Sequence, residues 1–211
     1  MNVLDWKTQI RKKDHAVADL AQSVTEDPGL VSELLAELKV PSAPVKYKAL
    51  KIITFLSLYH PALLNPHFDL FASMLDSPNN IFKWNAIDIL ANLTAVDGGH
   101  KFDLLFQKYY DLLKEGSLIT AGHVVDSSPV IVKNRPEWEP AVTSALLSAD
   151  CVPLPTPECR SILCGKVMKS FKQYFSSSSM RAEMREFARQ RLNDSRPATA
   201  EKARQLLKLL G

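Results

Sequence analysis

Apolar residues recur along this chain at the spacing of an amphipathic helix. Four stretches carry them at positions i, i+3, i+4 and i+7, beginning at Val31, Phe68, Phe102 and Val142. This spacing predicts one apolar stripe on a helix of about three turns in each stretch. The first members are 37, 34 and 40 residues apart, which fits two helices and their turns. The pattern therefore predicts a repeated pair of helices.

A second series of helices is predicted between these stretches, at 45–58, 81–96, 118–133 and 157–175. The breaks are rich in Pro, Gly, Asp and Asn, and "DSPNN" (76–80) supplies Asp76, Ser77 and Asn79 as predicted caps of the following helix. Pro129 lies inside the third helix of this series. An interior proline removes a backbone hydrogen bond, so we expect a kink or a split there.

One helical sequence pattern occurs twice in the chain. "VKYKALKIITFL" (45–56) and "FKWNAIDILANL" (82–93) keep the same order of basic, aromatic, small and aliphatic residues, 37 positions apart. A single helix pair cannot bury both of its apolar faces, whereas stacked similar pairs cover one another. Ala49 and Ala86 occupy the same place in the two copies, where a small side chain lets neighbouring helices approach closely.

The repeat resembles the HEAT and armadillo superfamily. The resemblance rests on "LDSPNNIFKWNAIDILANL" (75–93), on its copy at 45–56 and on "LNDSRPATAEKARQLLKLL" (192–210). It implies an all-α fold, a right-handed α-α superhelix of about five antiparallel HEAT-like helix pairs plus a terminal helix. We expect one domain over residues 1–211, with 148–158 and "SSSS" (176–179) as the segments that a protease cuts first. Motifs of this superfamily identify a fold and imply no activity.

Composition limits the class of protein. Apolar residues make up 46% of the chain and charged residues 23%, which is typical of a globular protein. No apolar run approaches the length of a membrane span, so we expect no membrane association. The first residues lack the pattern of a secretory signal, and the three cysteines do not indicate a disulfide framework. We therefore expect a cytoplasmic protein.

The charge is unevenly distributed. Residues 1–159 hold 14 Lys or Arg against 19 Asp or Glu, whereas residues 160–211 hold 12 against 4. Within the basic part, Arg181, Arg185 and Arg189 follow one another at i+4 and line one ridge of a predicted helix. Two interpretations stay open: a solvated outer ridge, or a surface for phosphates or an acidic partner.

No motif for catalysis or for a cofactor is recognisable. The cysteines form no C-x-x-C pair, and the histidines at 15, 60, 67, 100 and 123 are scattered. A zinc site needs about four convergent nitrogen or sulfur ligands, so we expect no metal. The glycines of "DGGHK" (97–101) follow a helix rather than a strand, so they predict a turn and no phosphate loop. We expect no cofactor and no catalytic residue.

Trp84 and Asp88 form the basis of an alternative function. They are four residues apart and share one face of a predicted helix. DNA alkylation-repair glycosylases have a HEAT-like fold, and "WNAID" (84–88) is similar to their arrangement of Trp and Asp in a basic groove. That resemblance implies DNA binding or repair, with the basic C-terminal part holding the nucleic acid. The alignment of Trp84 with Tyr47 in the internal repeat favours a structural aromatic residue instead.

The leading hypothesis is a non-enzymatic scaffold that binds a protein or peptide on the concave surface formed by the second helices of the pairs. The residues expected to bind are polar positions of those helices and the arginine ridge at the far end: Asp69, Gln107, Lys108, Asp111, Arg181, Arg185 and Arg189. This hypothesis follows from the resemblance to repeat proteins.

Overall fold

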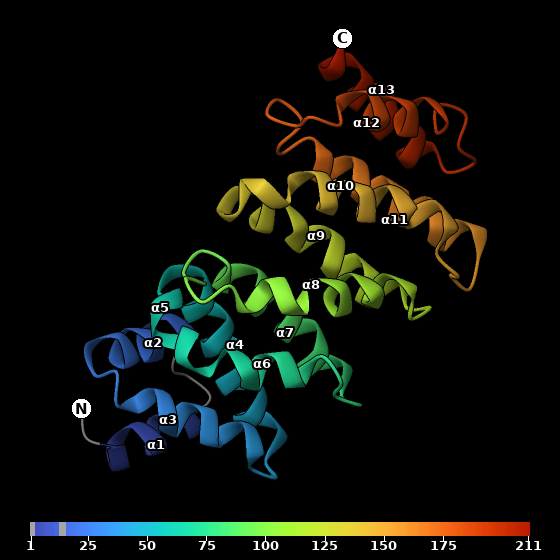
Figure 1. The fold of residues 1–211 in the computed structure, drawn as a ribbon. Coiled ribbons are helices and arrows are strands. Elements are labelled where there is room, and N and C mark those ends of the chain that lie inside the picture. Colours follow the sequence, from blue (N-terminus) through green and yellow to red (C-terminus); the bar gives the residue numbers. More distant parts are fainter. Residues whose placement is uncertain (1–2, 13–15) are drawn as a thin grey trace. The chain divides into compact units, whose positions relative to one another are not determined.

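The computed structural model describes residues 3–12 and 16–211, and every regular element in these residues is helical. His15 lies outside the described residues. The chain divides into two compact units, residues 1–101 and residues 102–211, which are described here one at a time. Figure 1 shows the helices in chain order. The expectation of a single domain over 1–211 stays a prediction.

The first unit is built on a row of three helices, α2, α4 and α7, in which each helix packs against the next. Shorter helices cover this row: α1 and α3 contact α4, and α5 and α6 contact α7 (Figure 1). The elements are α1 (Val3–Arg11), α2 (Val17–Glu26), α3 (Leu30–Ala36), η1 (Glu37–Lys39), α4 (Ala43–Tyr59), α5 (Pro61–Leu64), η2 (Asn65–His67), α6 (Phe68–Met74) and α7 (Asn80–Leu93).

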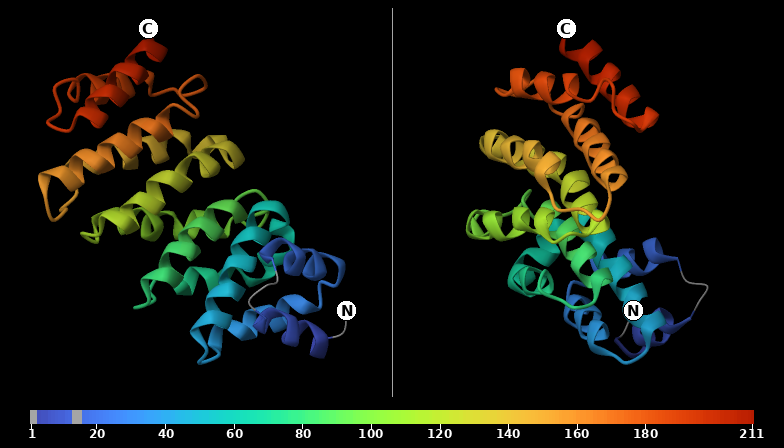
Figure 2. Two further views of the ribbon diagram at one scale, coloured as in Figure 1. Left: turned by 180° about the vertical axis from the view of Figure 1, so that it is seen from behind. Right: turned by 90° about the vertical axis from the view of Figure 1, so that its right-hand side faces the viewer.

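The second unit repeats this plan with a row of α9, α11 and α13. Helices α10 and α12 pack against members of the row, and Figure 2 shows them in a separate layer from it. The elements are α8 (Lys101–Asp111), η3 (Leu112–Lys114), α9 (Leu118–Asn134), η4 (Pro136–Trp138), α10 (Glu139–Leu147), η5 (Ser148–Cys151), α11 (Pro157–Phe171), α12 (Arg181–Arg189) and α13 (Pro197–Leu210). We call α4, α7, α9, α11 and α13 the long helices.

Three of the long helices, α7, α9 and α11, begin at a residue whose side chain caps them. Asn79 Oδ1 accepts a hydrogen bond from the backbone N–H of Ile81 at 3.0 Å, which confirms one of the three predicted caps of α7. The hydroxyls of Ser117 and Thr156 do the same at the starts of α9 and α11. A capping oxygen satisfies a backbone donor that has no partner inside the helix, which fixes the first turn.

The two copies of the repeated helix pack side by side as α4 and α7. Ala49 and Ala86 are fully buried, as the repeat predicts. Polar side chains also join the two helices: Thr54 Oγ1 donates to Asn85 Oδ1 at 2.8 Å, and Asn92 Nδ2 donates to Ser57 Oγ at 2.9 Å. The buried methyl groups between the helices supply the attraction, and these hydrogen bonds fix the register.

Pro129 does not split its helix. Helix α9 runs from Leu118 to Asn134 with the proline inside it, so of the expected kink or split the split does not occur. Residue 129 has no N–H to donate to the carbonyl of Val125 four positions earlier. The Ser170 hydroxyl of the neighbouring helix α11 donates to that carbonyl instead, at 2.7 Å. The helix therefore continues because a side chain of its neighbour replaces the missing donor.

We predict that Ala86→Leu destabilises the protein. The added side chain has no space, and overpacking costs about 1–3 kcal/mol, which lowers the melting temperature by several degrees. The control is Ala182→Leu, since Ala182 is exposed on α12. Thermal denaturation followed by circular dichroism measures both. Equal melting temperatures for the two variants would show that the helix faces are misassigned.

We also predict that Ser170→Ala costs about 1–3 kcal/mol in the wild-type background, because it leaves the buried Val125 carbonyl without a donor. In a Pro129→Ala background the cost is smaller, since the N–H of the new alanine reaches that carbonyl. A double-mutant cycle by urea denaturation measures the difference. Strict additivity of the two changes would rule out the proposed exchange of donors.

Candidate functional site

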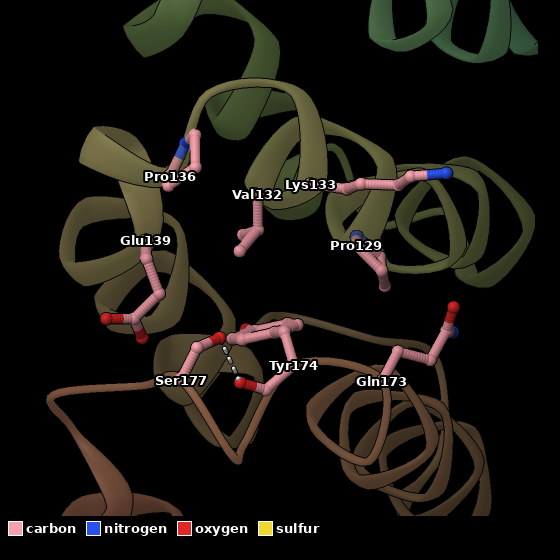
Figure 3. A pocket seen from close by; sticks show the side chains of 8 residues that line it. All are labelled: Pro129, Val132, Lys133, Pro136, Glu139, Gln173, Tyr174 and Ser177. Atoms are coloured by element: carbon pink, nitrogen blue, oxygen red, sulfur yellow. Dashed lines mark hydrogen bonds between the residues drawn. The ribbon is translucent and has the colours of Figure 1, made fainter.

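The second unit has a cavity of about 380 Å³ between α9, the start of α10 and the segment after α11. Figure 3 shows Pro129 and Val132 on one side, with Gln173 and Tyr174 opposite them. The Lys133 side chain leads away from the other lining residues. The remaining lining residues are Pro136, Glu139 and Ser177.

The carboxylate of Glu139, which lines this cavity, is hydrogen-bonded to neighbouring residues of the protein. Glu139 Oε1 accepts from Thr143 Oγ1 at 2.8 Å and from Ser178 Oγ at 2.6 Å. Its Oε2 accepts from the backbone N–H of Ser179 at 3.2 Å and from Ser179 Oγ at 3.1 Å. The Tyr174 hydroxyl lies 3.1 Å from Thr143 Oγ1. We call these five residues the Glu139 cluster.

The Glu139 carboxylate is ionised although it is buried. Burial raises the pKa of this carboxylate, whereas the hydrogen bonds from Ser178, Thr143 and Ser179 lower it. The combined effect of the hydrogen bonds is larger, so the pKa lies below its usual value. Glu139 is also the first residue of α10, where the helix dipole favours a negative charge. Burial raises the pKa of Tyr174, so its hydroxyl stays protonated. The cluster holds a structural charge and offers no base or nucleophile to a substrate.

The segment 176–179 is held by this cluster. Ser178 is buried, and both the backbone and the hydroxyl of Ser179 bond to Glu139. The expectation of early cleavage at 176–179 stays a prediction: Ser176, Ser177 and Ser179 are exposed, whereas Ser178 is buried. In the other expected segment, 148–158, exposed residues include Cys151, Pro153 and Pro155.

No metal centre is found in residues 3–12 and 16–211: they contain no group of three or more His, Cys, Asp or Glu placed to hold an ion. Over the same residues, no helix combines the length and the apolar character needed to cross a membrane.

The four polar residues expected on the binding surface do not lie on the long helices. Asp69 belongs to α6 in the first unit, where its carboxylate accepts from Lys101 Nζ at 2.9 Å. Gln107, Lys108 and Asp111 belong to α8, and Gln107 Nε2 donates to Asp111 at 3.0 Å. Gln107 and Asp111 also line a cleft of about 320 Å³ against α10. Helical spacing in the sequence shows an apolar stripe, but it does not show which helix of a pair is stacked.

The arginine ridge of α12 is less uniform than its spacing predicts. Arg181 and Arg189 are exposed. Arg185 is half-buried and donates from its Nη2 to the carbonyl of Leu210 at the end of α13. Of the two open interpretations, a solvated ridge therefore fits Arg181 and Arg189 but not Arg185, which the last helix partly covers.

Trp84 and Asp88 do share one side of α7, as their spacing predicts, and both are half-buried. They lie in the first unit, whereas the basic residues 160–211 lie in the second. The DNA-binding alternative that uses them stays a prediction.

The exposed sides of the long helices carry features that the sequence analysis did not single out. On α4 these are Leu58 and Tyr59, which are 56% and 60% exposed, and on α9 it is Ile119, at 54%. On α11 and α13 the exposed sides carry Lys169 and, partly covered, Lys166 and Lys202.

A comparison with solved structures identifies the fold. The chain is similar to a designed armadillo repeat protein, with a TM-score of 0.56 and 15% sequence identity over 100% of both chains. The fold is an armadillo-like, all-α solenoid, as the repeat predicts. No protein-family model and no curated protein sequence matches the chain.

The Glu139 cluster generates a pH-dependent prediction. Because the folded-state pKa of Glu139 is lowered, its ionised form stabilises the fold above the unfolded-state pKa, and this stabilisation is lost as the pH falls through the folded-state pKa. Glu139→Gln should therefore melt below wild type at neutral pH, with a difference that shrinks below about pH 4. Thermal melts across this pH range measure the difference.

The same variant should change proteolysis. With a protease of broad specificity, wild type is expected to be cut first within 148–158, and Glu139→Gln to gain a cut at 176–179. Early cleavage of wild type at 176–179 would show that Glu139 does not protect this segment. A difference in melting temperature that does not depend on pH would show that the ionised carboxylate does not stabilise the fold.

Proposed function

We propose that this protein is a non-enzymatic module that binds a protein or peptide on the exposed sides of its long helices. The observation that carries the proposal is the placement of large apolar side chains. Of six exposed large hydrophobic residues in the described part of the chain, five lie on the long helices: Leu58, Tyr59, Ile81, Ile119 and Leu209. Exposed large apolar side chains are a feature of binding sites.

The repeat fold supports this proposal. Solenoids built from helix pairs present extended surfaces that bind other chains. Both carboxylate oxygens of Glu139 are hydrogen-bonded inside the protein. The proposal therefore assigns no reaction to the chain, and it retains the expectation of a cytoplasmic protein without a cofactor.

The residues proposed for binding change accordingly. Apolar positions on the long helices replace Asp69, Gln107, Lys108 and Asp111 as the leading candidates. Arg181 and Arg189 remain exposed on α12, outside the row of long helices.

Selection from a displayed random-peptide library on the folded full-length protein tests the function. We expect selected peptides to lose affinity roughly tenfold with Leu58→Ser/Tyr59→Ser or with Ile119→Ser/Leu209→Ser, because a buried apolar contact is lost. Leu104→Ser is the matched control, since Leu104 is 92% exposed on α8 and lies off the long helices. The proposal fails if no peptide is selected, or if only Leu104→Ser weakens the selected peptides.

A further inference from the structure

Two lysines of the second unit lie across glycines of the preceding helix. A Cβ on Gly122 of α9 would lie 3.3 Å from Cε of Lys166, which comes from α11. A Cβ on Gly165 of α11 would lie 3.3 Å from Nζ of Lys202, which comes from α13. The same arrangement therefore occurs at two successive steps of the row.

Glycine destabilises the helix in which it lies, and the packing of the lysines explains why glycine occupies these two positions. A glycine inside a helix costs about 1 kcal/mol relative to alanine. At Gly165 an alanine would also crowd the Thr199 hydroxyl, at 3.2 Å. That hydroxyl donates to the carbonyl of Ser161 at 2.9 Å and so holds the start of α13 against α11. The glycines thus give space to the lysine side chains at the helix contact.

The charge of this region is only partly neutralised. Lys166 pairs with the half-exposed Asp126 of α9. Lys202 and Lys169 have no ion pair and no hydrogen bond with a side chain in residues 16–211. Burial lowers the pKa of Lys202, and the positive charges of Arg196, Lys169 and Lys166 lower it further. We call the exposed side of α11 and α13 that carries Lys166, Lys169 and Lys202 the basic face.

An anionic partner fits the basic face by charge. Each unpaired ammonium would gain a counter-charge, and the repulsion among the lysines would decrease. Neighbouring packed helices are roughly 8–10 Å apart, and an extended chain rises about 3.3 Å per residue. A segment of about six extended residues therefore crosses from α9 to α13.

The surroundings favour a peptide over a nucleic acid. Exposed Ile119 and half-buried Ile162 lie beside Lys166 and line a cleft with it and with Asp126. Apolar side chains of a peptide can be buried against these isoleucines, whereas a phosphate backbone makes no such contact. Single-stranded nucleic acids also need aromatic side chains on which bases stack. Helices α9, α11 and α13 expose no Phe, Tyr or Trp, because Phe171 of α11 is fully buried; the aromatic ring at this cleft is the imidazole of His123.

We infer that the basic face is a docking surface for an acidic segment of a partner protein. The segment lies extended across α9, α11 and α13, with carboxylates against Lys166, Lys169 and Lys202 and apolar side chains against Ile119 and Ile162. This inference rests on the proposed function and names the chemistry of the partner for the second unit.

The test uses a fluorescent peptide of about ten residues that alternates Glu with Leu, added to the full-length protein. Fluorescence anisotropy measures binding at low and at physiological salt. We expect binding that weakens with salt, and a roughly tenfold loss of affinity with Lys169→Glu/Lys202→Glu, because two attractive contacts become repulsive. A peptide with Gln in place of Glu should bind more weakly by a similar factor.

The matched control is Arg181→Glu/Arg189→Glu, which changes the net charge by the same amount on exposed positions of α12. It should leave the affinity within about twofold of wild type. Circular dichroism confirms that each variant is folded, and Lys169→Gln/Lys202→Gln replaces the charge reversal if that variant is not.

Three results overturn the inference. Absence of acidic-peptide binding, while library peptides bind the long helices, removes the inference and leaves the proposed function. Equal weakening by the α12 control shows attraction by net charge without a defined surface. Tighter binding of a single-stranded or duplex oligonucleotide that is lost with Lys169→Glu/Lys202→Glu assigns the basic face to nucleic acid instead.

Discussion

A long helix in the middle of a row must bury two flanks, and the rest of the structure depends on this constraint. One flank of α4 packs on α2 and the other on α7, and α11 lies in the same way between α9 and α13. Fully buried residues such as Ile52 and Ile53 of α4 and Ile89 of α7 fill these contacts. Burial of such side chains contributes about 1.5–3 kcal/mol each, so a helix pair removed from its neighbours would lose most of its stabilisation. The side of each long helix that is left uncovered is the side available to a partner.

Polar side chains bind backbone groups and buried charges that apolar packing alone would leave without partners. The Val125 carbonyl, which Pro129 leaves without its usual donor, accepts from Ser170 of the next helix. The irregular segment 176–179 is satisfied by Glu139, and buried Arg191 pairs with Asp150 at 2.9 Å and covers the ring of Phe187. Apart from the contact between Arg191 and Phe187, which are four residues apart, these contacts join residues from different parts of the chain. They make the order of the helices specific, whereas the apolar contacts make it stable.

The helix pairs, the close approach at Ala49 and Ala86 and the cap at Asn79 were predictable from the sequence, because each is set by residues close together in the chain. The positions of Asp69 and Gln107 relative to the stacked row were not, since an apolar stripe looks the same on a stacked and on a covering helix. The burial of Arg185 also escaped prediction, because the group that covers it is 25 residues away, at Leu210. Likewise, Gly165 in the sequence indicates only a weak helix, and its meaning depends on Lys202 of another helix.

The exchange of donors at Pro129 has a consequence for how the chain folds. Helix α9 cannot complete its backbone hydrogen bonding by itself, because the donor for Val125 arrives only when α11 packs against it. In a linear array of repeats, cooperativity is set by the interfaces between neighbours. The hydrogen bond from Ser170 of α11 to the Val125 carbonyl of α9 therefore stabilises the interface between the two helices and adds nothing to the intrinsic stability of either helix alone. The second unit should therefore form α9 and α11 as a single cooperative step, with amide protons of both helices exchanging together rather than one after the other.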